Sequence, residues 1–255
     1  MKIYETIHEA YLGTLADVID NPDYVCAPRG LKIREKTDYQ FRVLKPVAEP
    51  IVTLDTDRNK VIVDYTNKEV ELYNSCSNRV EDFAKASKFW KKIANKDGTI
   101  NSAYGYLIWK NKSHGDHIRE LELYGPNVTK DECYRTPWEW CKMALANDKD
   151  TRQAIIKFSL PEHHFKGNKD YVCTMHANFL IRDDKLNLSV VMRSNDLVKG
   201  IAYDIVFFVS LIDKMIVELK DIYPELTKGH YTHTVHSMHA YEKDLNTINK
   251  MLGRK

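Results

Sequence analysis

The longest run of patterned apolar positions lies between residues 205 and 219. Asp213, Lys214 and Glu218 interrupt this run, so it is too polar to span a membrane, and we expect no membrane partner. Apolar residues recur in it at i, i+3, i+4 and i+7, which predicts a helix with one broad face in the core. The apolar residues are Ile205, Phe208, Val209, Ile212, Met215, Ile216 and Leu219.

Two stretches before this helix predict a β-hairpin. Residues 171–181 and 186–192 are rich in β-branched and aromatic side chains, and the polar residues 182–185 form a turn between them. Residues 154–160 and 61–65 are predicted as further short strands, and residues 230–241 as a longer extended segment.

The extended segment 230–241 carries a histidine at every third position. Residues three apart point to opposite faces of a strand, so these four side chains cannot converge on one ion, and we expect no metal site. The four are His230, His233, His236 and His239.

Helical patterns fill much of the rest of the chain. Residues 3–18 repeat apolar positions at helical spacing until Asn21-Pro22, and residues 67–76, 80–95 and 136–147 are also predicted as helices. Turns are expected at 28–30 and 96–98, and a loop at 44–50, whereas the polar segment 114–134 fits no element. A length of 255 residues fits one large domain or two small ones, and no repeat or low-complexity stretch divides the sequence; we expect a single domain over residues 1–255.

Composition narrows the class of protein. The 38 basic and 36 acidic residues nearly cancel, which argues against a nucleic-acid partner. The five cysteines are odd in number and lack C-x-x-C spacing, so neither a disulfide framework nor a zinc site is expected. Glu5, His8 and Glu9 interrupt the first apolar run, which argues against a signal peptide. We therefore expect a cytoplasmic protein, or one of the host cytoplasm if its source is viral.

A set of chemically active residues surrounds the predicted hairpin. Cys173 lies near its start, Arg193-Ser194-Asn195-Asp196 closes it, and Gly200 and Asp204 follow. In combination this set resembles the thymidylate synthase family, which has a strand cysteine, a hairpin, Arg-Ser-x-Asp, a glycine and then Asn or Asp at a fixed distance. Thr174 stands where ordinary synthases have histidine, and Asp204 where they have asparagine. Both departures match the phage deoxycytidylate (dCMP) hydroxymethylases of that family.

The resemblance extends more weakly from about Gly30 to Tyr241. It implies an α/β (α+β) fold with a bent, mostly antiparallel or mixed sheet flanked by helices, and a back-to-back homodimer. It also implies transfer of a one-carbon unit from 5,10-methylenetetrahydrofolate to C5 of dCMP, completed by water, with no metal. A CMP hydroxymethylase and a thymidylate synthase acting on dUMP stay open, as does a catalytically silent nucleotide-binding interaction protein. The intact Cys173, Arg193 and Asp204 count against the silent protein.

Pyrimidine chemistry gives Cys173 its expected role. C5 is a poor nucleophile until a thiolate adds to C6 and turns the ring into an enamine. A lone cysteine is usually a small buried hydrophobe, but the Arg-Ser-x-Asp partner reverses that reading for Cys173. Arg193 and Ser194 are expected to bind the phosphate, and nearby arginines to lower the pKa of the thiol.

Asp204 is expected to select the base. Cytosine offers an amino donor, and a carboxylate accepts from it, and also from N3 once N3 is protonated. Against uracil the same carboxylate would face O4 with like partial charge. The alternative is that Asp204 caps the following helix.

The resemblance assigns the remaining site residues. Glu69 would face the substrate and manage water and protons, with Glu71 as its solvated neighbour unless the register slips by two. Trp90 would line the folate pocket, although a tryptophan is most often core. Arg152 would reach the phosphate bound by the partner subunit, and Gln153 replaces a second family arginine. The other expected ligands are Tyr104, Thr174, Asn178 and Asn195 near the base, His239 and Tyr241 at the sugar 3′-hydroxyl, Arg29 near the phosphate, and Asp196 and Gly200 near the folate.

Overall fold

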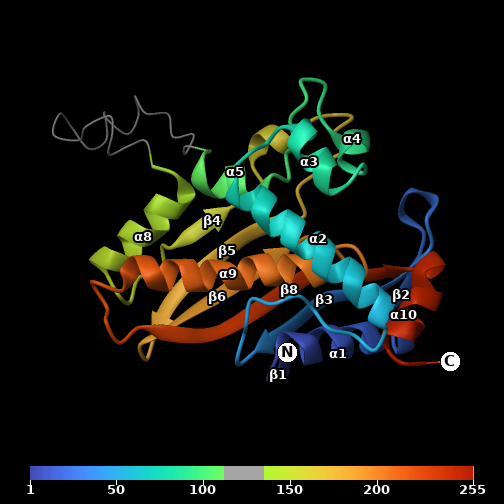
Figure 1. The fold of residues 1–255 in the computed structure, drawn as a ribbon, viewed down its shortest axis with the longest axis horizontal. Coiled ribbons are helices and arrows are strands. Elements are labelled where there is room, and N and C mark those ends of the chain that lie inside the picture. Colours follow the sequence, from blue (N-terminus) through green and yellow to red (C-terminus); the bar gives the residue numbers. More distant parts are fainter. Residues whose placement is uncertain (112–134, 255) are drawn as a thin grey trace.

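The computed structural model describes residues 1–111 and 135–254 (Figure 1). The segment 114–134, for which we predicted no element, lies outside the described residues. The helices are α1 (Ile7–Asp20), α2 (Thr56–Asn74), α3 (Val80–Ala86), α4 (Trp90–Ile93), α5 (Tyr104–Trp109), α8 (Pro137–Asn147), α9 (Ile201–Leu219) and α10 (Leu245–Met251), with short 3-10 turns at Pro28–Gly30, Pro161–His163 and Glu242–Asp244. The strands are β1 (Lys2–Tyr4), β2 (Tyr24–Cys26), β3 (Ile33–Val43), β4 (Ile155–Lys157), β5 (Thr174–Arg182), β6 (Lys185–Met192), β7 (Asn195–Asp196) and β8 (Thr227–Tyr241).

The strands form one mixed sheet in the order β1-β3-β8-β6-β5-β4, with β2 paired to β3 and β7 to β8. β3 and β8 pair antiparallel, as do β5 and β6, whereas β6 and β7 run parallel to β8. The predicted hairpin is confirmed, with Asp183 and Asp184 at its tip in the left-handed conformation that short polar residues tolerate in turns. The mixed sheet flanked by helices confirms the predicted fold class.

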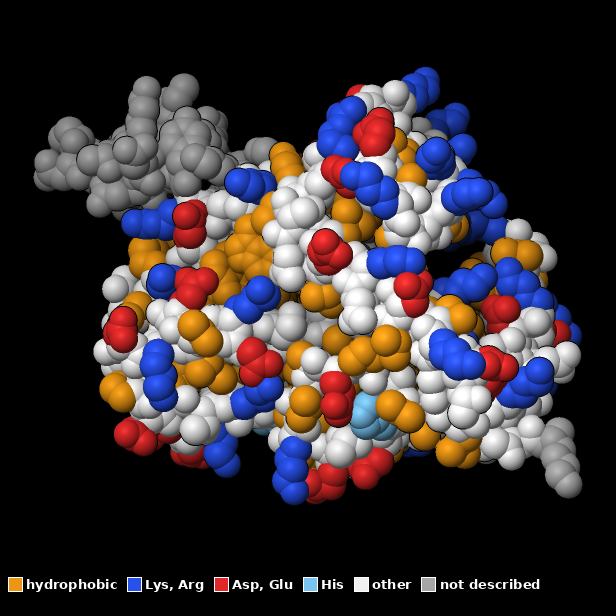
Figure 2. All heavy atoms as spheres, in the orientation of Figure 1, with side chains coloured by type: hydrophobic (Ala, Val, Ile, Leu, Met, Phe, Trp, Pro, Cys, Tyr) orange, Lys and Arg blue, Asp and Glu red, His pale blue; other side chains and the backbone are white. Residues whose placement is uncertain are grey.

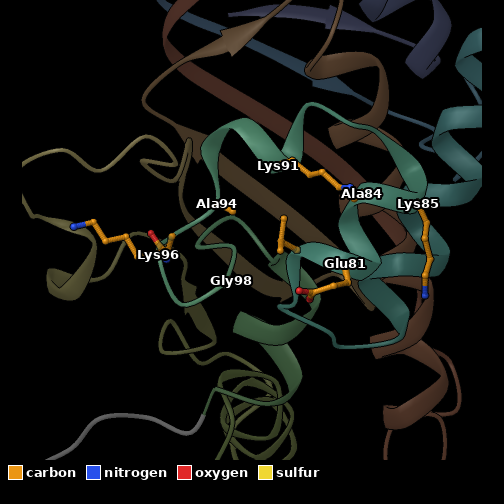
Figure 3. A pocket seen from close by; sticks show the side chains of 9 residues that line it. Glu81, Ala84, Lys85, Lys91, Ala94, Lys96 and Gly98 are labelled. Carbon is orange, nitrogen blue, oxygen red and sulfur yellow. The ribbon is translucent and has the colours of Figure 1, made fainter.

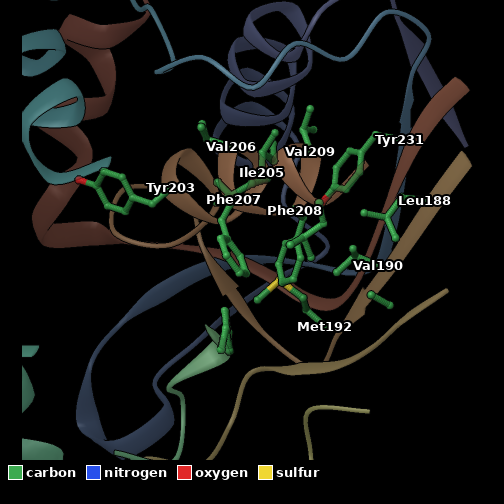
Figure 4. Packing of buried hydrophobic residues seen from close by; sticks show 14 of the residues in the cluster. Leu188, Val190, Met192, Tyr203, Ile205, Val206, Phe207, Phe208, Val209 and Tyr231 are labelled. Atoms are coloured by element: carbon green, nitrogen blue, oxygen red, sulfur yellow. The ribbon is translucent and has the colours of Figure 1, made fainter. Parts of the chain in front are cut away.

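The helix α9 lies across the inner face of β6 and β8 (Figure 1). Its apolar residues pack on both strands, as Figure 4 shows for Phe207 and Phe208 near Val190 and Met192. Gly200 is the residue that caps the helix, and Asp204 lies in the first turn. The alternative role of Asp204 as the helix cap is therefore wrong, and its side chain is left for other contacts.

Helix α2 corrects one prediction. Residues 61–65 are helical, not a strand, because Asp55 caps a helix that runs from Thr56 to Asn74. The Asp55 carboxylate accepts hydrogen bonds from the backbone N–H groups of Asp57 and Arg58, which satisfies two donors of the first turn. The β-branched Val61 and Val63 that suggested a strand lie on the exposed side of this helix.

Other boundaries shift by a few residues. The predicted helix 80–95 is two helices, α3 and α4, because Ser87 between them has extended backbone. The strand 154–160 is shorter, Ile155–Lys157, and Ile3 belongs to β1, whereas we predicted a helix there. The helix α1 begins where Thr6 and Glu9 form a capping box.

The surface carries both signs of charge, interspersed over the face shown in Figure 2. Lys and Arg side chains gather around a hollow on the right of this view, between the α3–α4 end and the β2 side. Among the described residues, no helix is both long and apolar enough to cross a membrane.

Candidate active site

Cys173 and Arg193 are held together at the end of the hairpin. Cys173 directly precedes β5, and its carbonyl oxygen accepts a hydrogen bond from the Arg193 backbone N–H at 2.9 Å. The Arg193 Nη2 atom also lies 3.4 Å from the half-buried sulfur. The hairpin pairing thus places a guanidinium beside the thiol.

The Arg193 side chain is anchored along one edge. Its Nε donates to the Val172 carbonyl at 3.0 Å, its Nη2 donates to the Tyr171 carbonyl, and the guanidinium lies 4.9 Å from the centre of the Tyr171 ring. Within the described residues Nη1 makes no such bond, which leaves it free to meet an anion.

The thiol is less acidic than we predicted. Burial raises the pKa of Cys173 and outweighs the lowering by the positive charge of Arg193, while the carboxylates of Asp204 and Asp170 raise it further. The expectation that arginines would lower this pKa is correct for the contribution of Arg193 but wrong for the net direction.

Asp204 shares the surroundings of Cys173. It projects from the first turn of α9, and burial raises the pKa of its carboxyl to about 7, against a lowering by a hydrogen bond from the Asn195 side chain. Its charge also raises the pKa of Tyr104 and of Cys173, so the carboxylate and the sulfur lie in one cluster.

Glu69 on α2 completes the acidic pair. Its side chain is buried, whereas Glu71 is exposed, which favours the register in which Glu69 faces the cluster. Burial and then the charge of Asp204 raise the pKa of Glu69 to about 8, although Tyr65 and Tyr73 hydrogen-bond to it and lower this pKa.

Tyr104 joins α2 and α5 to the cysteine strand. The Thr174 hydroxyl donates to the Tyr104 hydroxyl at 2.9 Å, and the Tyr104 ring stacks on Tyr73 at 5.3 Å. This approach requires Gly105, because a Cβ atom there would lie 1.7 Å from the Tyr73 carbonyl oxygen. A hydroxyl pair therefore stands where ordinary synthases have a histidine next to the cysteine.

The residues expected at the sugar and phosphate also come together. The Ser194 hydroxyl lies 3.5 Å from the His239 Nδ1, and the His239 and Tyr241 rings meet edge to face at 5.4 Å. The positive charge of Arg29 lowers the pKa of both Cys173 and Tyr241, so Arg29 stands on the same side of the cluster.

The residues expected near the folate have structural contacts of their own. The Asp196 Oδ1 accepts from the backbone N–H groups of Val198 and Lys199, and Trp90 packs edge to face on Phe83 at 4.9 Å. The Trp90 indole N–H is buried and lies beside the Tyr65 hydroxyl, where its hydrogen bond lowers the pKa of Tyr65 against the larger effect of burial, although the geometry of this bond is poor. Trp90 thus packs in the core and contacts Tyr65, a neighbour of Glu69.

A hollow of about 520 Å³ lies between α3, α4 and the turn at Gly98 (Figure 3). Lys85, Lys91 and Lys96 line it together with Glu81. Neither Cys173 nor Asp204 reaches it, so it is not the site described above.

Two predicted residues stay apart from the cluster. Asn178 lies on β5, where its side-chain nitrogen donates to the Ala154 carbonyl at 3.2 Å. Arg152 is exposed before β4 and makes no described contact with Cys173 or Arg193. Their roles stay predictions, since Arg152 was assigned to a partner subunit.

Several residues of the cluster were missed in the sequence. Tyr65 and Tyr73 stand four positions before and after Glu69, a spacing that puts all three on one helix face and could have indicated them. Tyr231 was not singled out, and His233 was considered only as a possible metal ligand, because the partner that ties His233 to the cluster, Asn195, is distant in sequence. The four histidines of β8 do alternate in burial, with His233 and His239 buried and His236 exposed. No group of three or more possible metal ligands occurs in the described parts of the chain.

Comparison with known proteins agrees with this geometry. The family model described as "Thymidylate synthase" matches residues 9–255. Deoxycytidylate 5-hydroxymethyltransferase of Enterobacteria phage T4 is 29% identical over 187 residues, covering 71% of this chain and 68% of the relative. Thymidylate synthase of Clostridium beijerinckii is 23% identical over 258 residues, covering 100% and 84%, and deoxyuridylate hydroxymethyltransferase of Bacillus phage SP01 is 24% identical over 240 residues, covering 92% and 57%. The structure of thermostable thymidylate synthase A from Bacillus subtilis superposes with a TM-score of 0.69 at 17% identity, covering 98% of this chain and 84% of that one.

Proposed function

The chain belongs to the thymidylate synthase family, and on that premise we propose that it is a deoxycytidylate 5-hydroxymethyltransferase. It would convert dCMP, 5,10-methylenetetrahydrofolate and water to 5-hydroxymethyl-dCMP and tetrahydrofolate. The observation that carries the proposal is Asp204, a half-buried carboxyl in the same cluster as Cys173, at the position where synthases reading uracil have an amide.

The base would be read by the two protonation states of Asp204. With a pKa of about 7, the carboxyl can give a proton to cytosine N3 as the sulfur adds to C6. The resulting carboxylate then accepts from N3–H and from the 4-amino group. Uracil has the O4 carbonyl oxygen in place of the 4-amino group, and a carboxylate has no hydrogen to donate to it.

Cys173 would form the covalent bond to C6, and its own proton must leave first. Glu69, with a pKa of about 8, is a base of suitable strength within the same buried cluster. The anchored edge of Arg193 fixes the direction of approach of the sulfur, while its Nη1, with Ser194, would bind the phosphate.

The residues also fit the one-carbon donor. The indole of Trp90, which contacts Tyr65 beside Glu69, would hold 5,10-methylenetetrahydrofolate together with the side chain of Asp196 and the backbone at Gly200. This group supplies a one-carbon unit at the oxidation level of formaldehyde. Glu69, fixed by Tyr65 and Tyr73, would hold the water that becomes the hydroxyl group.

Substrates other than dCMP remain rivals with their own support. The similarity to the deoxyuridylate enzyme of phage SP01 and to thymidylate synthases favours a dUMP substrate, whereas the carboxyl of Asp204 opposes it. The contact between Ser194 and His239, with Tyr241 beside it, fits a deoxyribose but also the ribose of CMP, because both sugars carry the 3′-hydroxyl that this pair would bind.

A homodimer is part of the proposal. The outward side of the sheet, opposite α9, carries half-buried polar residues on its central strands, which suits a second sheet packed against it. In that assembly Arg152 would reach the phosphate of the partner site. Sedimentation of the purified protein would show a dimer.

A product assay tests the proposed reaction. The protein is incubated with 5,10-methylenetetrahydrofolate and one of three nucleotides, dCMP, CMP or dUMP, each tritiated at C5. Tritium release is counted, and the products are identified by mass spectrometry. We expect tritium release and a hydroxymethyl product from dCMP in large excess over the other two. A methylated dUMP would indicate a synthase. No tritium release from any nucleotide would indicate a silent binding protein.

A further inference from the structure

A buried chain of hydrogen bonds runs behind Asp204, from Asn195 through His233 to Tyr231. The His233 ring is fully buried on β8, with its Nδ1 2.6 Å from the Tyr231 hydroxyl and its Nε2 3.3 Å from the Asn195 side-chain nitrogen. Parallel pairing of β6 and β7 with β8 brings these residues together. Figure 4 shows Tyr231 and Met192 on the inner side of the sheet, beside α9.

The surroundings of Asn195 fix which end of its amide faces Asp204. Its nitrogen has three polar neighbours, namely the Met192 sulfur at 2.9 Å, the His233 Nε2 at 3.3 Å and the Asp204 carboxyl. Ionised Asp204 and the Met192 sulfur can only accept, so the amino end points toward them, and the Asn195 oxygen is left buried without a hydrogen-bond partner among the described residues. The Asn195 oxygen turns toward Gly200, where a Cβ atom would lie only 2.3 Å from it.

The same arrangement fixes the tautomer of His233. Burial lowers its pKa to about 3, so the ring is neutral and has one donor and one acceptor. Since Nε2 accepts from Asn195, Nδ1 carries the proton and donates to the Tyr231 oxygen. The ring is also held by stacking on Phe41 at 5.2 Å.

We propose that His233 and Tyr231 are positioning residues for base selection, which keep the Asn195 amino group directed at Asp204 so that the carboxyl presents its other oxygen to the pyrimidine. The effect on base selection rests on the proposed function, whereas the effect of His233 and Tyr231 on the orientation of Asn195 does not. Without an acceptor at position 233, the amide of Asn195 can rotate and Asp204 loses its donor.

Titration of Asp204 tests the chain without any need for catalysis. The Asp204 carboxyl is followed by ¹³C NMR in the full-length wild type, in His233→Phe and in His233→Gln. Phenylalanine keeps the packing on Phe41 but cannot accept, whereas the glutamine oxygen can. We expect the pKa of Asp204 to rise by about half a unit or more in His233→Phe and to stay near the wild-type value in His233→Gln.

Other titrating groups around Asp204 must be assigned in the same spectra. They approach it from α2, α5, β8 and the segment before β5, and they are Glu69, Tyr73, Tyr104, Tyr231 and Cys173. None of them is changed in the two variants of His233. His236→Phe, an exposed histidine on the same strand, is the matched control and should leave the titration of Asp204 unmoved.

Tyr231→Phe gives a second, milder test. Loss of the hydroxyl removes the acceptor for Nδ1–H, so the proton can move to Nε2, which then no longer accepts from Asn195. We expect a smaller rise in the pKa of Asp204 than in His233→Phe. A pKa of Asp204 unchanged in both folded variants would overturn the inference.

The base preference supplies the functional half of the test. In His233→Phe the ratio of kcat/KM for dCMP over dUMP should fall on the order of tenfold, the cost of a hydrogen bond to a charged group. A purely structural role would lower both rates alike and leave the ratio unchanged. If the wild type shows no activity on dCMP, the proposed function fails. The NMR titration of Asp204 still tests whether His233 and Tyr231 position Asn195.

Discussion

The carboxyl groups of Glu69 and Asp204 act on each other in the buried site: the charge of Asp204 raises the pKa of Glu69, second only to the effect of burial. Glu69 comes from α2 and Asp204 from α9, two helices packed side by side. Because both acids titrate near neutral pH, one can exchange a proton with the pyrimidine while the other exchanges a proton with water.

This coupling predicts a fall in stability with rising pH. The pKa of Glu69 is raised from 4.5 to about 8, so between these values the folded state keeps a proton that the unfolded chain has lost. Stability therefore decreases as pH rises through this window. In Glu69→Gln the thermal midpoint, measured by circular dichroism from pH 5 to 8.5, should fall less steeply than in the wild type.

The exposed neighbour provides the control for that measurement. Glu71→Gln has the same chemistry on the same helix but removes a solvated group, so its midpoints should follow the wild type at every pH. Equal slopes for Glu69→Gln and the wild type would show that Glu69 ionises normally in the folded protein.

Asp204→Asn should change the preferred base. An amide can donate to uracil O4 and accept from N3–H, whereas a carboxylate can only accept while it is ionised. We expect the dUMP to dCMP ratio of kcat/KM to rise on the order of a hundredfold. Asp213→Asn on the outer side of the same helix should leave the ratio unchanged. An unchanged ratio in Asp204→Asn would remove Asp204 from base selection.

The arrangement around Cys173 could be predicted because the local pattern indicates the hairpin and the helix, and the family resemblance indicates which of their residues act together. Arg193 follows the cysteine across a hairpin whose strands and turn are marked by residue type, and Asp204 follows by a fixed distance at the start of an apolar helix. The burial that raises the pKa of the thiol could not be predicted, because it depends on α2 and α5 packing over the hairpin.

The hydrogen-bonded chain behind Asp204 could not be predicted from local sequence patterns. Asn195 and His233 meet only because β6 and β7 pair in parallel with β8, and nothing in any of these segments alone marks that pairing. Likewise, Val61 and Val63 suggested a strand by residue type. The Asp55 cap and the packing of the opposite side of the helix stabilise α2 instead.

Gly200→Ala should destabilise the protein. The added Cβ would lie 2.3 Å from the Asn195 Oδ1 and 2.9 Å from the Asp196 carbonyl, so either the amide or the turn before α9 must move. We expect a loss of about 1–3 kcal/mol in the free energy of unfolding, measured with urea. Wild-type stability with unchanged nucleotide binding would mean that this turn accommodates a side chain.

Cys173→Ser should abolish turnover and keep nucleotide binding. The hydroxyl is a far weaker nucleophile at neutral pH, whereas the phosphate contacts proposed for Arg193 and Ser194 do not involve the sulfur. Calorimetric titration with dCMP and the tritium assay together check both halves. Retained turnover would exclude Cys173 as the nucleophile.

The acidity of Cys173 should respond to its charged neighbours with opposite signs. Arg193→Gln removes the largest lowering influence and should raise the pKa of the thiol, whereas Asp204→Asn removes a raising influence and should lower it. Arg29→Gln should raise it slightly, since Arg29 is the weakest of these influences.

The pH dependence of alkylation by iodoacetamide, read from the mass of the Cys173 peptide, gives each pKa of the thiol. Arg182→Gln at the far end of β5 is the control and should not shift it. Shifts of the same sign in Arg193→Gln and Asp204→Asn would contradict the electrostatic account, because a positive and a negative neighbour must act on a thiolate in opposite directions.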